Sequence, residues 1–290
     1  MKTIKIGNNT IGDGYPVYFT AEIGINHNGD MQIAKRLLDA TFVAGWNCAK
    51  FQKRTPSICV PEHQKNLMRS TPWGEMTYLD YRYRLEFEKE QYDYIDNYCR
   101  EKPLSWTASV WDIKSLEFIL NYNVPFIKIP SAKITDNEIL SECAKSGKPV
   151  FFSSGMSTLE EVDNAVNIVD KYTKEYVLFH TNSSYPAKHE ELNLKVIETL
   201  RNRYGCIIGY SGHEYDLEPS VVATVLGAKV IERHVTINHN LWGSDQAASL
   251  EVDGMIKLYN RIADIFPILG DGKKFVIGSE LEVRKKLRIK

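Results

Sequence analysis

Several features are scarce in this sequence of 290 residues, and each absence excludes a class of protein. It has five cysteines and no Cys-x-x-Cys pair, which favours free thiols in a reducing cytoplasm over a disulfide framework. Its 36 basic and 37 acidic side chains nearly cancel, so no global field favours nucleic acid or an anionic membrane. The longest apolar runs are too short to span a bilayer, and residues 1–7 lack the apolar stretch of a secretory signal. We therefore expect a cytoplasmic protein with no nucleic-acid or membrane partner.

The sequence instead contains a repeated alternation of strand-like and helix-like segments, with 43% apolar residues to form a core. Eight short runs, most of them rich in β-branched residues, show continuous rather than alternating apolarity, which is typical of strands covered on both faces. They are residues 17–24, 48–52, 105–110, 126–130, 150–155, 176–181, 206–212 and 230–236. Helix-start signals lie between them, including Asp30 and the capping boxes at Thr135 and Ser157. We predict one (β/α)8 TIM barrel domain over residues 1–290. The competing fold is an open, doubly wound sheet, but no Gly-x-Gly-x-x-Gly motif follows the first strand of this sequence.

Two segments fall outside this repeat. Residues 1–14 are expected to hold a short N-terminal β-hairpin, turning at Asn8-Asn9, that plugs the bottom of the barrel. Residues 53–86 are expected to form a long loop after the second strand. A loop of that length in a compact domain is usually functional, for example a lid or an oligomer contact.

Two histidines, His213 and His234, each follow a β-branched run, and a helix-like segment separates them. They are therefore expected at the carboxyl ends of adjacent parallel strands, where two imidazoles could hold one divalent metal ion. A lone histidine is more often a hydrogen-bonded core residue, and we interpret His27 and His180 in that way. Two protein ligands would leave the metal open to substrate and water, as a Lewis-acid site requires.

Two lysines, Lys50 and Lys128, also stand near strand ends, where a buried ammonium group is costly unless an anion faces it. Each is either a rim residue or part of a ligand site, and Glu22 is either ion-paired with Lys50 or functional. Many polar residues follow the same strands: Gln52, Ser109, Trp111, Ser131, Lys133, Ser153, Ser154, Asn182, Ser183, Tyr185, Ser211 and Asp245. Together they predict a pocket for a small ligand with phosphate and carboxylate groups, held by side chains rather than by a glycine-rich loop.

The motifs at these strand ends resemble those of the sialic acid synthase family. They are Ala21-Glu-Ile-Gly-Ile-Asn-His-Asn-Gly, Lys50-Phe-Gln, Ile127-Lys-Ile-x-Ser, Ser153-x-Gly-Met, Ser184-Tyr-Pro, Gly209-Tyr-Ser-Gly-His and Glu232-Arg-His. Members of that family condense phosphoenolpyruvate with an aldehyde sugar, such as N-acetylmannosamine or a related aldose, to a 2-keto-3-deoxy sugar acid. Phosphate leaves by C–O cleavage. The resemblance implies a divalent metal, usually Mn2+ with Mg2+ or Co2+ as alternatives.

The resemblance also implies a role for each matching residue. His213 and His234 match the metal ligands. The residues implied in catalysis are Glu22, Lys50, Lys128 and Tyr185. The residues implied in substrate binding are Gln52, Ser131, Lys133, Ser153, Ser183, Ser211 and Asp245. A homodimer is expected as well, with the 53–86 loops meeting over each other's sites.

Two departures from the family pattern matter. Where members commonly read Gly-Ser-Gly-Glu, this chain reads Pro130-Ser-Ala-Lys133, and a cationic lysine is no base unless its pKa is strongly lowered. Glu22 or the substrate phosphate would then take that role. The sequence also lacks the usual C-terminal antifreeze-like domain, which leaves open another aldehyde sugar or a separately encoded partner domain.

Two other functions remain as alternatives. A catalytically silent relative that binds phosphoenolpyruvate or sugar is motivated by Lys133 and the missing domain. A metal-dependent barrel hydrolase is the other, but such enzymes usually carry His-x-His after strand one, where this chain has Asn26-His27-Asn28.

Overall fold

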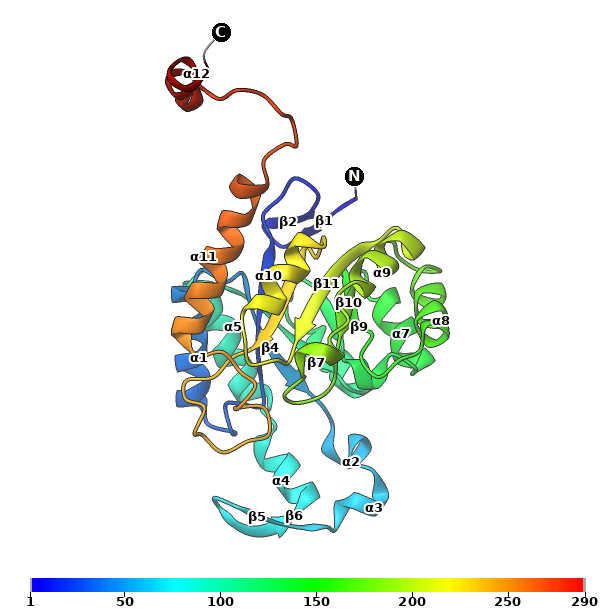
Figure 1. Cartoon of the computed structure of the whole chain (residues 1–290). Coiled ribbons are helices and arrows are strands. Elements are labelled where there is room, and N and C mark those ends of the chain that lie inside the picture. The colour runs from blue at the N-terminus through cyan, green and yellow to red at the C-terminus, as the bar shows by residue number, and fades with distance from the viewer. Residues whose placement is uncertain (1, 289–290) are drawn as a thin grey trace.

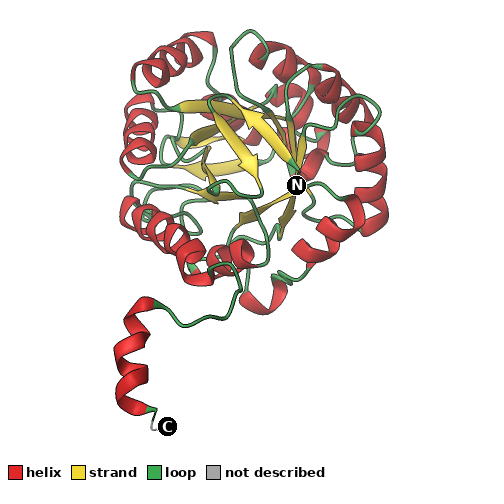
Figure 2. Cartoon of the chain, turned by 90° about the horizontal axis from the view of Figure 1, so that it is seen from above, coloured by secondary structure: helices red, strands yellow, loops and turns green. Residues whose placement is uncertain are grey.

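The computed structural model describes residues 2–288; Met1 and residues 289–290 lie outside the described part. Within it, eight parallel strands close into a barrel with a ring of helices around it (Figures 1 and 2). The strands are β3 (Tyr18–Gly24), β4 (Cys48–Lys53), β7 (Ser105–Val110), β8 (Ile127–Ile129), β9 (Val150–Ser153), β10 (Tyr176–Thr181), β11 (Ile207–Gly212) and β12 (Val230–His234). The predicted (β/α)8 barrel is confirmed, and every predicted run matches one barrel strand to within two residues at each end.

A helix follows each strand and covers its outer face. The helices are α1 (Met31–Val43), α5 (Lys89–Glu101), α6 (Ile113–Ile119), α7 (Asn137–Lys145), α8 (Leu159–Val169), α9 (Val196–Tyr204), α10 (Glu218–Val225) and α11 (Val252–Leu269). In α1 the predicted cap Asp30 accepts a hydrogen bond from the Gln32 amide, at 2.7 Å. Ala34, Leu37 and Leu38 then share the buried stripe that faces the barrel. None of the helices in residues 2–288 is long and apolar enough to cross a membrane.

The interior of the barrel changes from apolar to polar along the strands, because alternate residues of each strand point inward. At the amino-terminal end the interior is apolar, with Tyr18, Cys48, Phe126, Phe151, Val177, Phe179, Ile207 and Val230. The hairpin of β1 (Thr3–Ile6) and β2 (Asn9–Gly12) packs Ile4, Ile6 and Ile11 against them. The predicted plug is therefore confirmed, although it turns at Gly7-Asn8, where Gly7 supplies a positive φ of 56°.

The segment 53–86, hereafter the arm, projects from the opposite end of the barrel (Figure 1). The prediction of a loop was wrong in this respect, because the arm has secondary structure of its own. It contains α2 (Pro56–Cys59), α3 (Glu62–Lys65), the hairpin β5 (Met68–Thr71) and β6 (Gly74–Thr77), and α4 (Tyr78–Leu85). Its core is small: Tyr81 and Leu85 pack with Ile25 of the barrel, and Trp73 and Met76 lie against them.

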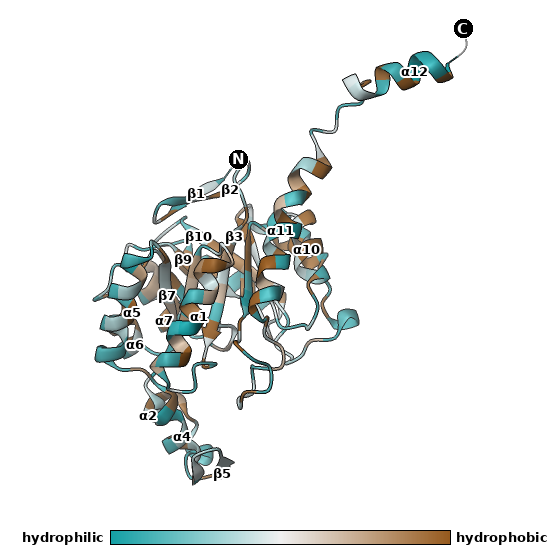
Figure 3. Ribbon diagram, turned by 90° about the vertical axis from the view of Figure 1, so that its left-hand side faces the viewer, coloured by the Kyte–Doolittle hydropathy of each residue, from teal (hydrophilic) through white to brown (hydrophobic). Residues whose placement is uncertain are grey.

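The C-terminal segment stands apart from the barrel. After α11 the chain continues through η3 (Gly278–Glu280) to α12 (Leu281–Leu287), and residues 266–288 are all exposed. Figure 3 shows α12 well away from the barrel, with both hydrophobic and hydrophilic residues on its surface. The barrel is therefore complete without this segment.

Candidate active site

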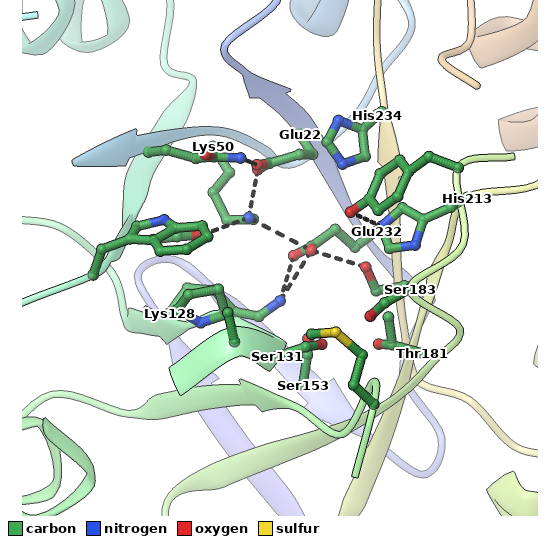
Figure 4. Close-up of a pocket in the computed structure, with 18 residues that line it drawn as sticks. Glu22, Lys50, Lys128, Ser131, Ser153, Thr181, Ser183, His213, Glu232 and His234 are labelled. Carbon is green, nitrogen blue, oxygen red and sulfur yellow. Dashed lines mark hydrogen bonds and ion pairs between the residues drawn. The ribbon is translucent and has the colours of Figure 1, made fainter. Parts of the chain in front are cut away.

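The polar half of the barrel interior forms a cavity of about 230 Å3 at the carboxyl ends of the strands (Figure 4). Eleven of the predicted site residues line it: Glu22, Lys50, Gln52, Lys128, Ser131, Ser153, Ser183, Tyr185, Ser211, His213 and His234. They come from seven barrel strands and the turns that follow them, so residues far apart in sequence meet here. We refer to this space as the inner cavity.

Two lysines and two glutamates form a buried network at the floor of the inner cavity (Figure 4). Lys50 is ion-paired with Glu22, and its Nζ lies 3.5 Å from Oε1 of Glu232. Lys128 Nζ lies 2.9 and 3.1 Å from the two carboxylate oxygens of Glu232. These four side chains are at most 5% exposed. The anions that the lysines require are thus supplied by the protein, and the formal charges of the network cancel.

The pKa values of these four groups are shifted in different directions. Burial raises the pKa of Glu22, whereas Lys128 and Lys50 outweigh burial at Glu232 and lower its pKa to about 2. Burial lowers the pKa of Lys128 to about 8, and at Lys50 the facing carboxylates outweigh burial and raise the pKa. Glu232 is therefore a permanent anion that fixes both lysines, and Glu22 is the carboxyl group that accepts a proton most readily.

Glu232 was not predicted as a site residue, although it belongs to the quoted Glu232-Arg-His motif. It lies two residues before His234 on β12, so both side chains point into the barrel. Ser211 on the neighbouring strand donates a hydrogen bond to Glu232 Oε1, at 3.1 Å. The spacing to His234 was the signal that could have identified it.

His213 and His234 lie side by side, with ring centroids 5.3 Å apart, and both are buried. His213 donates from Nδ1 to the carbonyl oxygen of Asn182, so its Nε2 carries the lone pair; this Nε2 lies 2.8 Å from the Tyr185 hydroxyl. His234 Nδ1 is buried without a hydrogen-bond partner, 3.7 Å from Oδ2 of Asp245. Each imidazole therefore has one ring nitrogen, Nε2 of His213 and Nδ1 of His234, that makes no hydrogen bond to the backbone of residues 2–288.

Burial keeps these two imidazoles neutral, which is the form that binds metals. It lowers the pKa of His213 to about 3, with a further contribution from His234, and it lowers the pKa of His234 as well. The donor set fits a divalent cation. In residues 2–288 no group of three or more His, Cys, Asp or Glu side chains is arranged to hold a metal, so the protein itself would supply the two imidazoles.

The other two histidines of interest have structural contacts, as interpreted from the sequence. His27 stacks on Phe87 with ring centroids 3.9 Å apart, and its Nδ1 accepts a hydrogen bond from the amide of Gly29. His180 is buried, and its Nε2 is hydrogen-bonded to the carbonyl oxygen of Leu192 at 2.7 Å. Neither ring lines the inner cavity.

The hydroxyl groups of the inner cavity are held close together by one glycine. The Gly155 amide donates to Ser131 Oγ at 3.1 Å, and a Cβ on Gly155 would lie 2.2 Å from Ser183 Oγ. Ser153 Oγ is buried and has no hydrogen-bond partner in the structure. These hydroxyl groups are available to a ligand that occupies the cavity.

Two predicted substrate-binding residues do not line the inner cavity. Lys133, in η1 (Ser131–Lys133), points elsewhere and is ion-paired with Asp136 at 3.2 Å. The short 3-10 turn places Ser131 at this cavity and leaves Lys133 outside its lining, and the role of Lys133 in substrate binding stays a prediction. Asp245 lines a neighbouring, larger space of about 800 Å3, the outer cavity. The two cavities share Gln52, Trp111 and Tyr185, so they form one continuous site.

Comparison with known proteins decides the family. Residues 37–274 match the NeuB family. The chain belongs to the NeuB family. Human N-acetylneuraminate-9-phosphate synthase is 35% identical over 282 residues, which cover 96% of this chain and 78% of the human protein. N,N'-diacetyllegionaminic acid synthase from Legionella pneumophila is 32% identical over 288 residues, covering 96% of this chain and 80% of that protein.

A solved structure from the NeuB family agrees with this assignment. The N-acetylneuraminic acid synthetase of Leptospira borgpetersenii, in complex with citrate, superposes with a TM-score of 0.88 at 32% identity, covering 100% of this chain and 98% of that one. The predicted resemblance to sialic acid synthases is therefore confirmed. This NeuB family member is an enzyme of the sugar-acid synthase kind.

Proposed function

We propose that this enzyme condenses phosphoenolpyruvate with an aldehyde sugar to a 2-keto-3-deoxy sugar acid and inorganic phosphate. The observation that supports this most directly is the inner cavity. Lys50, Lys128 and a set of serine hydroxyls face a small space beside the paired imidazoles of His213 and His234. A three-carbon enol phosphate has an anionic group at each end, which matches two separated ammonium groups and several hydroxyl donors.

In this proposal the floor network orients phosphoenolpyruvate. Lys50 and Lys128, fixed by Glu232, bind its anionic ends and hold the methylene carbon toward the outer cavity. That carbon forms a bond to the aldehyde carbon of the sugar. Water then adds to the former enol carbon, and the tetrahedral intermediate breaks its C–O bond to release phosphate.

Glu22 is the residue proposed to handle the proton at the aldehyde oxygen. Its raised pKa allows it to donate a proton to the developing alkoxide, and Gln52 donates a hydrogen bond to its Oε1 at 2.8 Å. Tyr185, beside His213, is placed to orient the sugar. Lys133 has no part in this scheme, since its ion pair with Asp136 holds it outside the inner cavity.

We further propose that His213 and His234 hold a divalent metal ion, Mn2+ by preference. A bound divalent ion supplies Lewis acidity that polarises a carbonyl oxygen. The two imidazoles, kept neutral by burial, are the ligands that this chain contributes.

Phosphate release from phosphoenolpyruvate tests the proposed reaction. The unmodified protein with Mn2+ and a panel of hexosamines, pentoses and aldose phosphates should release phosphate only when an aldehyde is present. His213→Ala should lose this activity while its circular dichroism spectrum stays unchanged, and His27→Ala is the control for removal of a buried imidazole outside the site. No release with any aldehyde, together with phosphoenolpyruvate binding in calorimetry, would favour the silent ligand-binding relative instead.

A further inference from the structure

The outer cavity has a charge that the proposed reaction with a neutral sugar does not explain. Three arginines line it, Arg54, Arg69 and Arg82, and Asp245 is the one acid among the described residues that do so. All three arginines belong to the arm: Arg54 follows β4, Arg69 lies on β5 and Arg82 on α4. A cationic wall thus faces the mouth of the inner cavity.

These arginines differ in whether the protein already neutralises them. Arg54 is buried, its Nε lies 3.1 Å from Oε1 of Glu86, and its guanidinium lies over the Trp111 ring at 4.2 Å. In residues 2–288, neither Arg69 nor Arg82 has a carboxylate within ion-pair distance. Both guanidinium groups lie near the same ring, Tyr78, at 4.2 and 5.3 Å from its centroid.

The positive charges of the three arginines repel one another, and this repulsion also acts on the buried Arg54. Burial and, next, the neighbouring charge of Arg82 lower the pKa of Arg54. Such repulsion is relieved when an anion binds between the guanidinium groups, and arginine forms bidentate hydrogen bonds with phosphate oxygens.

The walls of the outer cavity suit the rest of a sugar phosphate. Tyr81 and Trp242 meet edge to face with ring centroids 5.2 Å apart, and Trp111 and Tyr185 line both cavities. Aromatic faces pack against the C–H faces of a sugar, and their polar atoms bind its hydroxyl groups. In the proposed reaction a sugar lying here would turn its aldehyde end to the inner cavity, which His213 lines, and its far end to the arm.

We propose that Arg69 and Arg82, with Arg54 behind them, bind a phosphate group on the far end of the sugar, so that the substrate is a phosphorylated aldose. This inference rests on the proposed function, because it assumes that the sugar occupies the outer cavity. The relatives do not decide it, since their products include both a 9-phosphate and unphosphorylated acids by name.

The test compares matched sugars in the unmodified protein and two variants. The substrates are phosphoenolpyruvate and Mn2+ with N-acetylmannosamine or its 6-phosphate, and with mannose or its 6-phosphate. The test variant is Arg69→Gln/Arg82→Gln. The control variant is Arg84→Gln, because Arg84 is exposed on the same helix and stacks on Trp73 without lining the outer cavity.

The expected result is a selective loss. The double variant should lower kcat/KM for the phosphorylated sugar roughly 100-fold, as expected when charge-assisted hydrogen bonds are lost, and leave the free sugar within about twofold. Arg84→Gln should change neither value. Inorganic phosphate should compete with the phosphorylated sugar and not with the free sugar.

Three outcomes would overturn the inference while leaving the proposed reaction intact. The first is a higher kcat/KM of the unmodified protein for the free sugar than for the phosphorylated one. The second is an equal loss of kcat/KM for both sugars in the double variant. The third is a rise in KM for phosphoenolpyruvate in the double variant, with no selective change for the phosphorylated sugar. The last would mean that the arginines bind the enol phosphate. An absence of phosphate release with every sugar would instead contradict the proposed function itself.

Discussion

The buried network of Glu22, Lys50, Lys128 and Glu232 shows how single residues set the chemistry of this barrel. Glu232 contacts both lysines and is the carboxylate that faces Lys128, while Lys50 also has Glu22. An isolated buried charge is far more costly than a paired one. The lysines are therefore held in place by the same carboxylate that makes their burial tolerable.

Replacing that carboxylate should be strongly destabilising. Glu232→Gln leaves Lys128 buried without its counter-charge, and we expect the free energy of unfolding to fall by about 3–5 kcal/mol. Urea denaturation at neutral pH measures this loss. The control is Glu62→Gln, which removes the exposed ion pair with Lys65 and should have little effect. A loss in Glu232→Gln no larger than that of the control would contradict the role assigned to the network.

A second buried carboxyl group makes stability depend on pH. Burial raises the pKa of Glu86 to about 7, although Arg54 and Lys53 oppose this rise. Because the folded value lies above the unfolded one, protonation of Glu86 stabilises the fold at low pH, and this contribution is lost as pH rises from about 4.5 to about 7. The difference between the two pKa values corresponds to about 3 kcal/mol.

Denaturation of the unmodified protein and Glu86→Gln across this range measures the effect. The free energy of unfolding of the unmodified protein, relative to the variant, should fall by about 3 kcal/mol between pH 4.5 and pH 7.5. The variant cannot titrate at this position, so it removes the pH dependence of other groups from the comparison. Parallel curves would show that Glu86 keeps an ordinary pKa.

The prediction of single residues succeeded where a strand end was marked in the sequence, and failed where a partner had to be found across the barrel. The two histidines each follow a β-branched run, and Lys50 and Lys128 lie on predicted strands. The contact of Glu232 with Lys128 joins residues 104 positions apart, and it depends on the shear of the closed barrel. Nothing in Pro130-Ser-Ala-Lys133 predicts the 3-10 turn that brings Ser131, but not Lys133, to the inner cavity.

At the scale of elements, the runs of apolar residues located every barrel strand, while boundaries and connections were less certain. Asp136 caps α7 and Thr158 caps α8, each one residue after the box predicted at Thr135 or Ser157. Adjacent residues of similar capping ability cannot be separated by sequence alone. The secondary structure of the arm was missed because its helices and strands are very short.

The close approach of the segments after β8, β9 and β10 can be tested at Gly155. A methyl group in Gly155→Ala would lie 2.2 Å from Ser183 Oγ and 2.7 Å from Ser131 Oγ, so both hydroxyls must move. We expect kcat/KM for phosphoenolpyruvate to fall roughly 10–100-fold, since small misplacements of binding groups are costly. Gly254→Ala in α11, where the nearest atom is 3.6 Å away, should have no effect. Equal activity of both variants would show that these hydroxyls do not bind the substrate.

At the scale of the whole molecule, the arm and the C-terminal segment are the parts that the barrel does not bury. Leu67 and Met68 of the arm are 52% and 62% exposed, and we propose that the predicted homodimer covers them. We expect light scattering at micromolar concentration to show a dimer, and Leu67→Ser/Met68→Ser to convert it to a monomer without loss of helical content. Removal of residues 271–290 is the control, and it should leave the dimer intact. A monomeric unmodified protein would refute the prediction.

The β1–β2 hairpin has a kinetic consequence. Because it covers the amino-terminal end of the barrel, and because the two cavities share Gln52, Trp111 and Tyr185, we infer that the inner cavity is reached through the outer one. In the proposed reaction phosphoenolpyruvate would then bind in the inner cavity before the sugar fills the outer one. The closed end of the barrel would thus set the order in which the two substrates bind, without a moving gate.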